Sequence, residues 1–279
     1  MTGHPERKHH DSGMSESTLT VLTLNCLFRP HARARLAALA PLLENSTADV
    51  LCLQEVVWRR NVALVRRLTP TFKAAAMMPN LGAGIRGGLL TLSRRSIEFQ
   101  RFEVYRRRGR LRTIAFADWL LRKGFLTTHL SVDGQSIAVI NTHLLANYDE
   151  DWSPGNDYAR QLGDELKQLT SAILDMAQTM PVVVAGDLNV PADTALFEGF
   201  KEAAGLTDGF VGQHPPTAHP ASRSLPDHTI DYVLVRVPRG RSCSITSRVV
   251  LDQEVLLGDG QRTRLSDHAA VQSVIRFEA

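Results

Sequence analysis

Short apolar runs with the length and composition of β-strands recur along this chain of 279 residues. Examples are "LTVLTLNCL" (19–27), "DVLCLQEVVW" (49–58) and "MPVVVAGDLNV" (180–190). The continuous Val run in the last of these predicts a strand that is buried on both faces. Further strand-like runs are expected at "HTIDYVLVRV" (228–237) and "HAAVQSVIRF" (268–277). A chain with this many strands has to build sheets and cover their apolar faces.

Helical periodicity is visible in three segments. Residues 32–46 have it but contain Pro41, which is expected to interrupt the helix. Residues 60–68 predict a short helix, and 156–178 predict the longest amphipathic one. We expect a single α/β domain over 18–279, with mixed sheets faced by helices, after a disordered tail over 1–17.

Two pairs of neighbouring runs predict antiparallel strands. "KGFLTTHLSV" (123–132) and "QSIAVINTHL" (135–144) are separated by a turn containing Asp-Gly. "LLTLSRR" (89–95) and "SIEFQRFEVY" (96–105) follow each other directly and also predict a hairpin.

Composition narrows the class of protein. The apolar content of 43% at this length supports a substantial core, and the net charge of +3 does not by itself indicate a nucleic-acid-binding protein. Three cysteines, Cys26, Cys52 and Cys243, are odd in number and widely spaced, so neither a disulfide framework nor a zinc site is expected. No stretch has the pattern of a secretory signal or a membrane span, so we expect a cytoplasmic protein for which any membrane contact is peripheral. We also expect a monomer.

The strand-like runs share an unusual ending, which is a hard oxygen ligand or an imidazole. A single polar strand end usually forms a turn or a helix cap, but a buried polar group costs free energy unless it is paired or binds something. Repeated endings of this kind predict that the strand ends converge on one polar site. The residues are Asn25, Glu55, His143, Asp187, Asn189, Asp231, Asp267 and His268.

The oxygen ligands among them predict a metal site. Asn25, Glu55 and Asp267 offer only oxygen atoms, which favours Mg²⁺, or Mn²⁺, over a softer ion. Mg²⁺ takes few protein carboxylates and leaves room for the oxygens of a substrate phosphate.

The remaining residues suit acid–base chemistry around that metal. His143 and His268 titrate near neutrality and are candidates for general acid and base. Asp187 is expected to align an attacking water, with Asn189 donating a hydrogen bond to the developing charge. Because their spacing is two, Asp187 and Asn189 are expected on one face of an extended segment. Asp231 is expected to fix the tautomer of His268. The implied reaction is metal-assisted hydrolysis of a phosphoester.

At these residues the sequence resembles the endonuclease/exonuclease/phosphatase superfamily. The resemblance implies a four-layer sandwich of two packed sheets with outer helices, and a divalent metal held chiefly by Glu55. It implies that His143 is a second catalytic histidine and that the other residues have the roles given above. The matching motifs are "LNC" (24–26), "LQEV" (53–56), "NTHL" (141–144), "GDLN" (186–189), "IDYVL" (230–234) and "SDHAAV" (266–271).

Within that superfamily the sequence is most similar to the neutral sphingomyelinases. The segments that carry this likeness are "RGGLLTLSRRSI" (86–97), "NTHLLANYDED" (141–151) and "DYARQLGDEL" (157–166). "DWLLRKGFL" (118–126) resembles a segment in which those enzymes use an Asp/Lys pair as a switch near the substrate, here Asp118 and Lys123. A surface ion pair, or two unrelated solvated residues, explains Asp118 and Lys123 equally well.

Three functions are consistent with these patterns. The first is a Mg²⁺-dependent phosphodiesterase acting on a phospholipid head group or a related small phosphodiester. The second is a nuclease that holds DNA or RNA through the Arg-rich segment 106–112, which is otherwise a solvated loop. The third is a non-catalytic binding module on the same fold. His129, in a similar Thr-His-Leu setting, is expected to be structural.

Overall fold

The structure is a computed structural model of the chain. It describes residues 17–28, 31–80, 82–106, 122–212, 214–219, 227–257, 260 and 262–278. Residues 1–16 of the expected tail, Asp118 and most of the Arg-rich segment lie outside the described residues. Ser17, the last residue of the expected tail, is the first residue of a strand.

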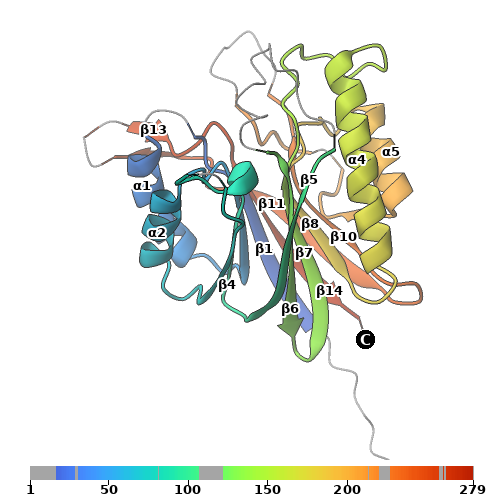
Figure 1. Cartoon of the computed structure of the whole chain (residues 1–279), viewed down its shortest axis with the longest axis horizontal. Helices are drawn as coiled ribbons and strands as arrows, with labels where there is room; N and C mark the ends of the chain where they lie inside the picture. The colour runs from blue at the N-terminus through green and yellow to red at the C-terminus, as the bar shows by residue number, and fades with distance from the viewer. Residues whose placement is uncertain are drawn as a thin grey trace, which may run out of the picture.

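Two six-stranded mixed sheets form the centre of the molecule (Figure 1). Most neighbouring strands are antiparallel, and the parallel pairs are β1 with β2 and β7 with β8. In spatial order the first sheet is β11 (Cys243–Val250), β14 (Ala270–Phe277), β1 (Ser17–Asn25), β2 (Val50–Gln54), β4 (Leu90–Ser93) and β3 (Ala74–Ala76). The second is β5 (Ile97–Val104), β6 (Gly124–Val132), β7 (Gln135–His143), β8 (Val182–Asp187), β10 (Asp231–Arg236) and β9 (Thr207–Asp208).

Helices cover the outer face of each sheet, so the protein is a four-layer α/β sandwich, as expected (Figure 1). Helices α1 (Ala32–Glu44) and α2 (Arg59–Leu68) pack on the first sheet, and α4 (Asp157–Met176) and α5 (Ala195–Ala204) on the second. Apolar side chains from the two sheets interlock between them, including Val21, Val139 and Val183. The short helix η1 (Arg86–Gly88) leads into β4.

Away from the strand ends, one expectation about a helix and one about a hairpin are wrong. Pro41 does not interrupt the first helix, which continues to Glu44. The buried stripe that includes Leu36, Leu39 and Leu43 spans the proline, and its packing offsets the lost backbone hydrogen bond.

The runs at 89–95 and 96–105 do not form a hairpin. β4 pairs with β2 and β3, whereas β5 pairs with β6 in the other sheet. The connection between them is held by Arg94, which donates to the carbonyls of Glu44, Ser46 and Ala48. The alternation of apolar residues is the same for a hairpin and for a chain that changes sheet, so the sequence pattern did not distinguish them.

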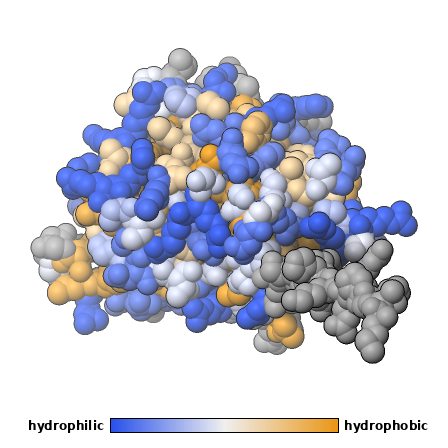
Figure 2. Space-filling model, turned by 90° about the horizontal axis from the view of Figure 1, so that it is seen from below, coloured by the Kyte–Doolittle hydropathy of each residue, from blue (hydrophilic) through white to orange (hydrophobic). Residues whose placement is uncertain are grey.

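The hairpin of β6 and β7 is confirmed, and Asp133 and Gly134 take the positive φ angles that its tight turn needs. A second small hairpin, β12 (Glu254–Leu256) with β13 (Arg262–Arg264), was not expected from the sequence. Within the described residues, no helix has the length and apolar character needed to cross a membrane. Figure 2 shows a largely hydrophilic face on which apolar residues are scattered in small groups.

Strand direction brings the polar endings together. Asn25, His143 and Asp187 are the last residues of β1, β7 and β8. Asp231 is the first residue of β10 and pairs directly with Asp187 because the two strands are antiparallel. His268 precedes β14, which is antiparallel to β1, so it returns to the same end of the sandwich.

Candidate active site

Glu55 lies just beyond β2 in a left-handed conformation, with φ of 60°. Its Oε1 accepts from Asn25 Nδ2 at 3.2 Å, and its Oε2 accepts from the backbone N–H of Phe28 at 2.5 Å. Gly88 packs so close that a Cβ there would lie 3.2 Å from Glu55 Cα. The turn therefore directs the carboxylate toward the end of β1.

Asn25 connects this carboxylate to the second sheet. Its Nδ2 also donates to Asp187 Oδ2 at 3.0 Å, and its Oδ1 accepts from the backbone N–H of Leu27. One amide therefore bridges two carboxylates that are far apart in the sequence.

Asp187 and Asn189 are neighbours through a turn and not through an extended segment, so that part of the sequence interpretation is wrong. Asn189 has φ of 51°, and its backbone N–H donates to Asp187 Oδ1 at 2.9 Å. Its Nδ2 donates to the carbonyl of Leu144 at 3.0 Å. Gly186 lets β8 approach β7, because a Cβ there would lie 2.0 Å from the carbonyl oxygen of Thr142.

His268 and Asp231 form a buried pair. His268 Nδ1 lies 2.8 Å from Asp231 Oδ2, and His268 Nε2 lies 3.9 Å from Asp187 Oδ2. Burial disfavours the imidazolium, but the negative charges of Asp231 and Asp187 outweigh it and raise the pKa of His268 to about 10. Burial, followed by the charge of Asp231, raises the pKa of Asp187 to about 7. The site therefore contains two neighbouring groups with different pKa values: a protonated imidazole, His268, and a carboxyl group, Asp187, that titrates near neutrality.

His143 has the opposite character. Its Nε2 lies 2.9 Å from Lys123 Nζ and 3.4 Å from Asp187 Oδ2. Burial, then the charges of Lys123 and His268, lower the pKa of His143 well below its usual range. An ammonium group only donates, so His143 Nε2 accepts and the ring proton is on Nδ1. Lys123 also donates to the carbonyl of Leu144 at 2.7 Å. Lys123 thus lies beside His143, and the expected partnership with Asp118 falls outside the described residues.

Two hydroxyl groups position the site and were missed by the sequence interpretation. Thr217 Oγ1 accepts from the backbone N–H groups of Ile230 and Asp231. Ser266 Oγ donates to the carbonyl of Asn25 at 2.6 Å and accepts from the N–H of His268 at 3.1 Å. Ser266 is in the "SDHAAV" motif, which was a usable signal, whereas nothing near Thr217 in the sequence indicated its role.

The donor atoms fit a hard divalent cation. Asn25 and Glu55 are in contact. Burial lowers the pKa of Arg35, while the charges of Asp267, Cys26 and Glu55 act to raise it. The two predicted carboxylate ligands, Asp267 and Glu55, therefore both interact with the guanidinium of Arg35. A second group, Asp187, Asp231 and His268, offers three ligand atoms within 4.8 Å of one another. In that group, Asp231 and His268 are already hydrogen-bonded to each other. Oxygen donors predominate in both groups, as Mg²⁺ requires.

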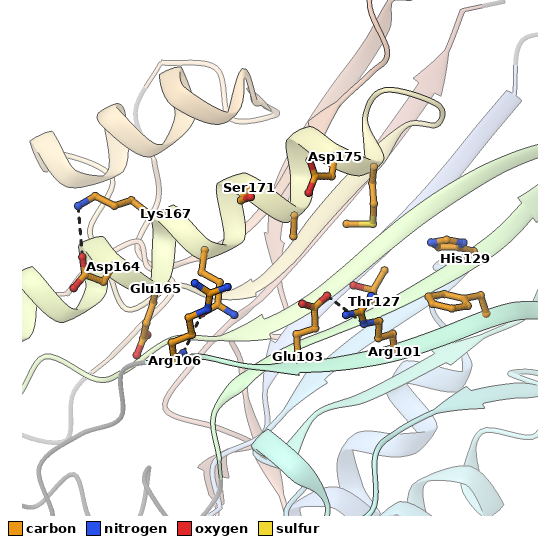
Figure 3. A pocket seen from close by; sticks show the side chains of 14 residues that line it. Arg101, Glu103, Arg106, Thr127, His129, Asp164, Glu165, Lys167, Ser171 and Asp175 are labelled. Atoms are coloured by element: carbon orange, nitrogen blue, oxygen red, sulfur yellow. Dashed lines mark hydrogen bonds and ion pairs between the residues drawn. The ribbon is translucent and has the colours of Figure 1, made fainter.

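A wide groove of the described residues lies elsewhere, on the outer side of the second sheet. It has a volume of about 860 Å³ and lies between α4 and strands β5 and β6, with Asp164, Lys167 and Asp175 facing Arg101 and Glu103 across it (Figure 3). His129 lines this groove, with its ring tilted against that of Phe99 at 4.6 Å between centroids, away from the converging strand ends. We place the chemistry at the strand ends because the buried, interacting ionisable groups are there.

Comparison with known proteins gives one family, one relative in sequence and several solved structures of the same fold. A Drosophila melanogaster protein named "Putative neutral sphingomyelinase" is 32% identical over 139 residues, which are 47% of this chain and 30% of that protein. The matched region is thus about a third of that relative's length.

Many solved structures share the fold, and three are examples. Beta toxin from Staphylococcus aureus, with bound magnesium ions, has a TM-score of 0.73 and 15% identity, covering 92% of this chain and 99% of that one. Sphingomyelinase C from Streptomyces griseocarneus has a TM-score of 0.69 and 20% identity, covering 94% of this chain and 99% of that one. D. rerio TDP2, in complex with a single-strand DNA product, has a TM-score of 0.72 and 15% identity, covering 93% of this chain and 99% of that one. The family model for the Endonuclease/Exonuclease/phosphatase family matches residues 22–268, and the chain belongs to that family.

Proposed function

We propose that this protein is a divalent-metal-dependent phosphodiesterase that cleaves a phospholipid head group or a related small phosphodiester. Members of its family are hydrolases that act on phosphodiesters. The observation that carries the proposal is the meeting of Asn25, Asp187 and His268 at one end of the sandwich, with hydrogen-bonded contacts to Glu55 and Asp231.

The metal site is the first part of the proposal. Glu55, Asn25 and Asp267 would hold Mg²⁺, which when bound supplies positive charge to a phosphate oxygen. The magnesium ions in beta toxin, a protein of the same fold, support this choice of ion.

The proton chemistry follows from the two ionisation states. Asp187, with its raised pKa, is suited to align a water molecule and accept its proton. His268, kept protonated by Asp231, is suited to donate to the oxygen of the leaving group. The second N–H of the Asn189 side-chain amide can donate a hydrogen bond to a phosphate oxygen on which negative charge develops during the reaction. His143 directs the Lys123 ammonium toward the same space.

A phospholipid substrate is supported by similarity. The Drosophila relative has a neutral sphingomyelinase name, and the segments at 86–97, 141–151 and 157–166 resemble that group. The relative's substrate is extended to this chain only as part of the proposal.

One panel of substrates tests the function. Purified protein with Mg²⁺, Mn²⁺ or EDTA is given sphingomyelin, lysophospholipid, plasmid DNA, single-stranded RNA and bis-p-nitrophenyl phosphate. We expect metal-dependent turnover of a lipid without nicking of DNA. Nicking without lipid turnover would instead support the nuclease, and no metal-dependent turnover of any substrate would support a binding module.

A further inference from the structure

A buried carboxyl group on helix α4 has no role in the site described so far. Glu165 is only 3% exposed and lies on the inner face of the helix, with Leu162 and Leu166. It is the only charged residue among the buried residues of α4. Figure 3 shows its side chain pointing from α4 toward the strands. Because a buried carboxyl group costs free energy unless it is hydrogen-bonded, its partners indicate its role.

Both oxygens of the Glu165 carboxyl group accept hydrogen bonds. Oε2 accepts from the backbone N–H of Leu145 at 3.0 Å, and Oε1 accepts from Gln161 Nε2 at 3.2 Å, one turn earlier on α4. The contact with Gln161 orients the carboxyl group. Leu145 lies two residues beyond His143, the last residue of β7. The outer helix therefore holds the chain where it leaves β7.

The N–H of Leu145 and the carbonyl of Leu144 belong to one peptide unit. This peptide is trans, so the unit is planar and its N–H and C=O point in opposite directions. The Leu144 carbonyl accepts from Lys123 Nζ at 2.7 Å and from Asn189 Nδ2 at 3.0 Å. An acceptor that fixes the N–H therefore also fixes the direction of the carbonyl. Through this plane, Glu165 is connected to two donors of the site.

Bulk solvent does not reach this peptide unit. Leu144 is fully buried and Leu145 is 2% exposed. The preceding peptide unit is fixed from β8, because the N–H of Leu144 donates to the carbonyl of Asp187 at 3.0 Å. A buried N–H without an acceptor costs free energy. Without the Glu165 carboxyl group, the next unit is therefore expected to tilt toward another acceptor and to shift its carbonyl.

We propose that Glu165 is a positioning residue of the active site that acts through the peptide unit of Leu144 and Leu145. By fixing this unit, it holds the Lys123 ammonium and the Asn189 amide in place. The inference rests on the proposed phosphodiesterase function, in which the Asn189 amide donates to a phosphate oxygen. It gives the outer helix layer a part in a site whose predicted residues all come from strand ends and turns.

The kinetic test removes the acceptor and then restores it. Glu165→Leu has no acceptor, whereas Glu165→Gln keeps a carbonyl oxygen that can accept from the Leu145 N–H. With bis-p-nitrophenyl phosphate and Mg²⁺, we expect Glu165→Leu to have a kcat about tenfold below the wild type and a KM within about twofold, because the displaced donors act on charge that develops in the transition state. Glu165→Gln should stay within about threefold of the wild-type kcat. Equal losses in the two variants, or wild-type kcat in Glu165→Leu, would overturn the proposal.

Asp49→Leu is the matched control for the loss of a carboxyl anchor. Asp49 Oδ2 accepts from the backbone N–H of Thr20 at 2.9 Å, so it also fixes a backbone N–H in a neighbouring element. Asp49 precedes β2, whereas Glu55 follows the end of that strand, which places the contact at the other end of the sheet from the site. Asp49→Leu should lower Tm, as Glu165→Leu should, but leave kcat unchanged. An equal loss of kcat in the control would show that destabilisation alone explains the effect, and would overturn the positioning role.

NMR keeps the two proposals separable, because it needs no turnover. In protein with ¹⁵N-labelled leucine and asparagine, we expect Glu165→Leu to speed hydrogen exchange of the Leu145 amide and to shift the side-chain amide signals of Asn189. Both observables should stay close to the wild type in Glu165→Gln and Asp49→Leu. If the wild type hydrolyses no phosphodiester, the proposed function fails, but these spectra still decide the role of Glu165. Unchanged Leu145 exchange and Asn189 signals in Glu165→Leu would overturn it.

Discussion

Asp231 Oδ2 lies 2.8 Å from His268 Nδ1, and this contact determines the state of the imidazole at the centre of the site. Asp231 is fully buried, and its other oxygen, Oδ1, has no hydrogen-bond partner within the described protein. The hydrogen bond to His268 is therefore the main polar interaction of the Asp231 carboxylate among the described residues.

Asp231→Asn should reduce kcat roughly 10- to 100-fold, because the amide keeps the shape of the side chain but removes the charge that holds His268 protonated. Steady-state kinetics on bis-p-nitrophenyl phosphate would measure the loss, and NMR titration should show a lower pKa for His268. Unchanged kcat together with unchanged titration would contradict the role given to Asp231.

His268→Ala should reduce kcat by at least about 100-fold, because it removes the proton donor of the site. The matched control is His129→Ala, since His129 lies in the outer groove and should not affect turnover. Circular dichroism and thermal melting should show that both variants are folded. Wild-type kcat in the His268 variant would refute the assignment.

In the presence of EDTA, the stability of the wild type should decline as pH rises from about 6.5 to about 10. The native state keeps the His268 proton up to about pH 10, whereas the unfolded chain releases it near 6.5. This contribution is complete below the unfolded pKa and is lost as pH rises through the folded pKa. Urea unfolding at several pH values should show a flatter profile for His268→Asn than for the wild type. Parallel profiles would show that the proton affinity of His268 is not raised by folding.

Mg²⁺ should raise the melting temperature of the wild type, because a ligand that binds only the folded state stabilises it. Glu55→Gln should abolish most of this increase, since it removes the charge of the main predicted ligand. Glu98→Gln serves as the control, because Glu98 is an exposed carboxylate on β5. Thermal shift against Mg²⁺ concentration gives a readout that does not depend on catalysis, and an equal shift in Glu55→Gln would exclude Glu55 as the principal ligand.

Gly186→Ala should destabilise the protein by about 3 kcal/mol or more, because its Cβ would collide with Thr142 in the adjacent strand and its φ of 153° disfavours other residues. Gly155→Ala is the control, since a Cβ at Gly155 meets no atom within 4 Å, and it should change stability by less than about 0.5 kcal/mol. Chemical denaturation would measure both. Similar values for the two variants would show that the close approach of β7 and β8 is not required.

Local sequence determined most of the long strands, the longest helix and the polar residues at the strand ends, because period-two and period-3.6 apolar patterns and buried polar groups are visible in short windows. The motifs around Glu55, Asp187 and His268 were sufficient to predict the family and the convergence of those side chains.

Only the tertiary structure decided which sheet each strand joins. It places β4 and β5, which are consecutive in the sequence, in different sheets. It also revealed that Thr217 holds Asp231, that His143 accepts from Lys123, and that Trp152 lies against Asn189. Residues such as Asn25 and Asp187 are 162 positions apart in the chain, and no local pattern encodes the pairing of side chains at that separation. These contacts depend on strand direction and sheet packing, which form only when the whole sandwich is assembled.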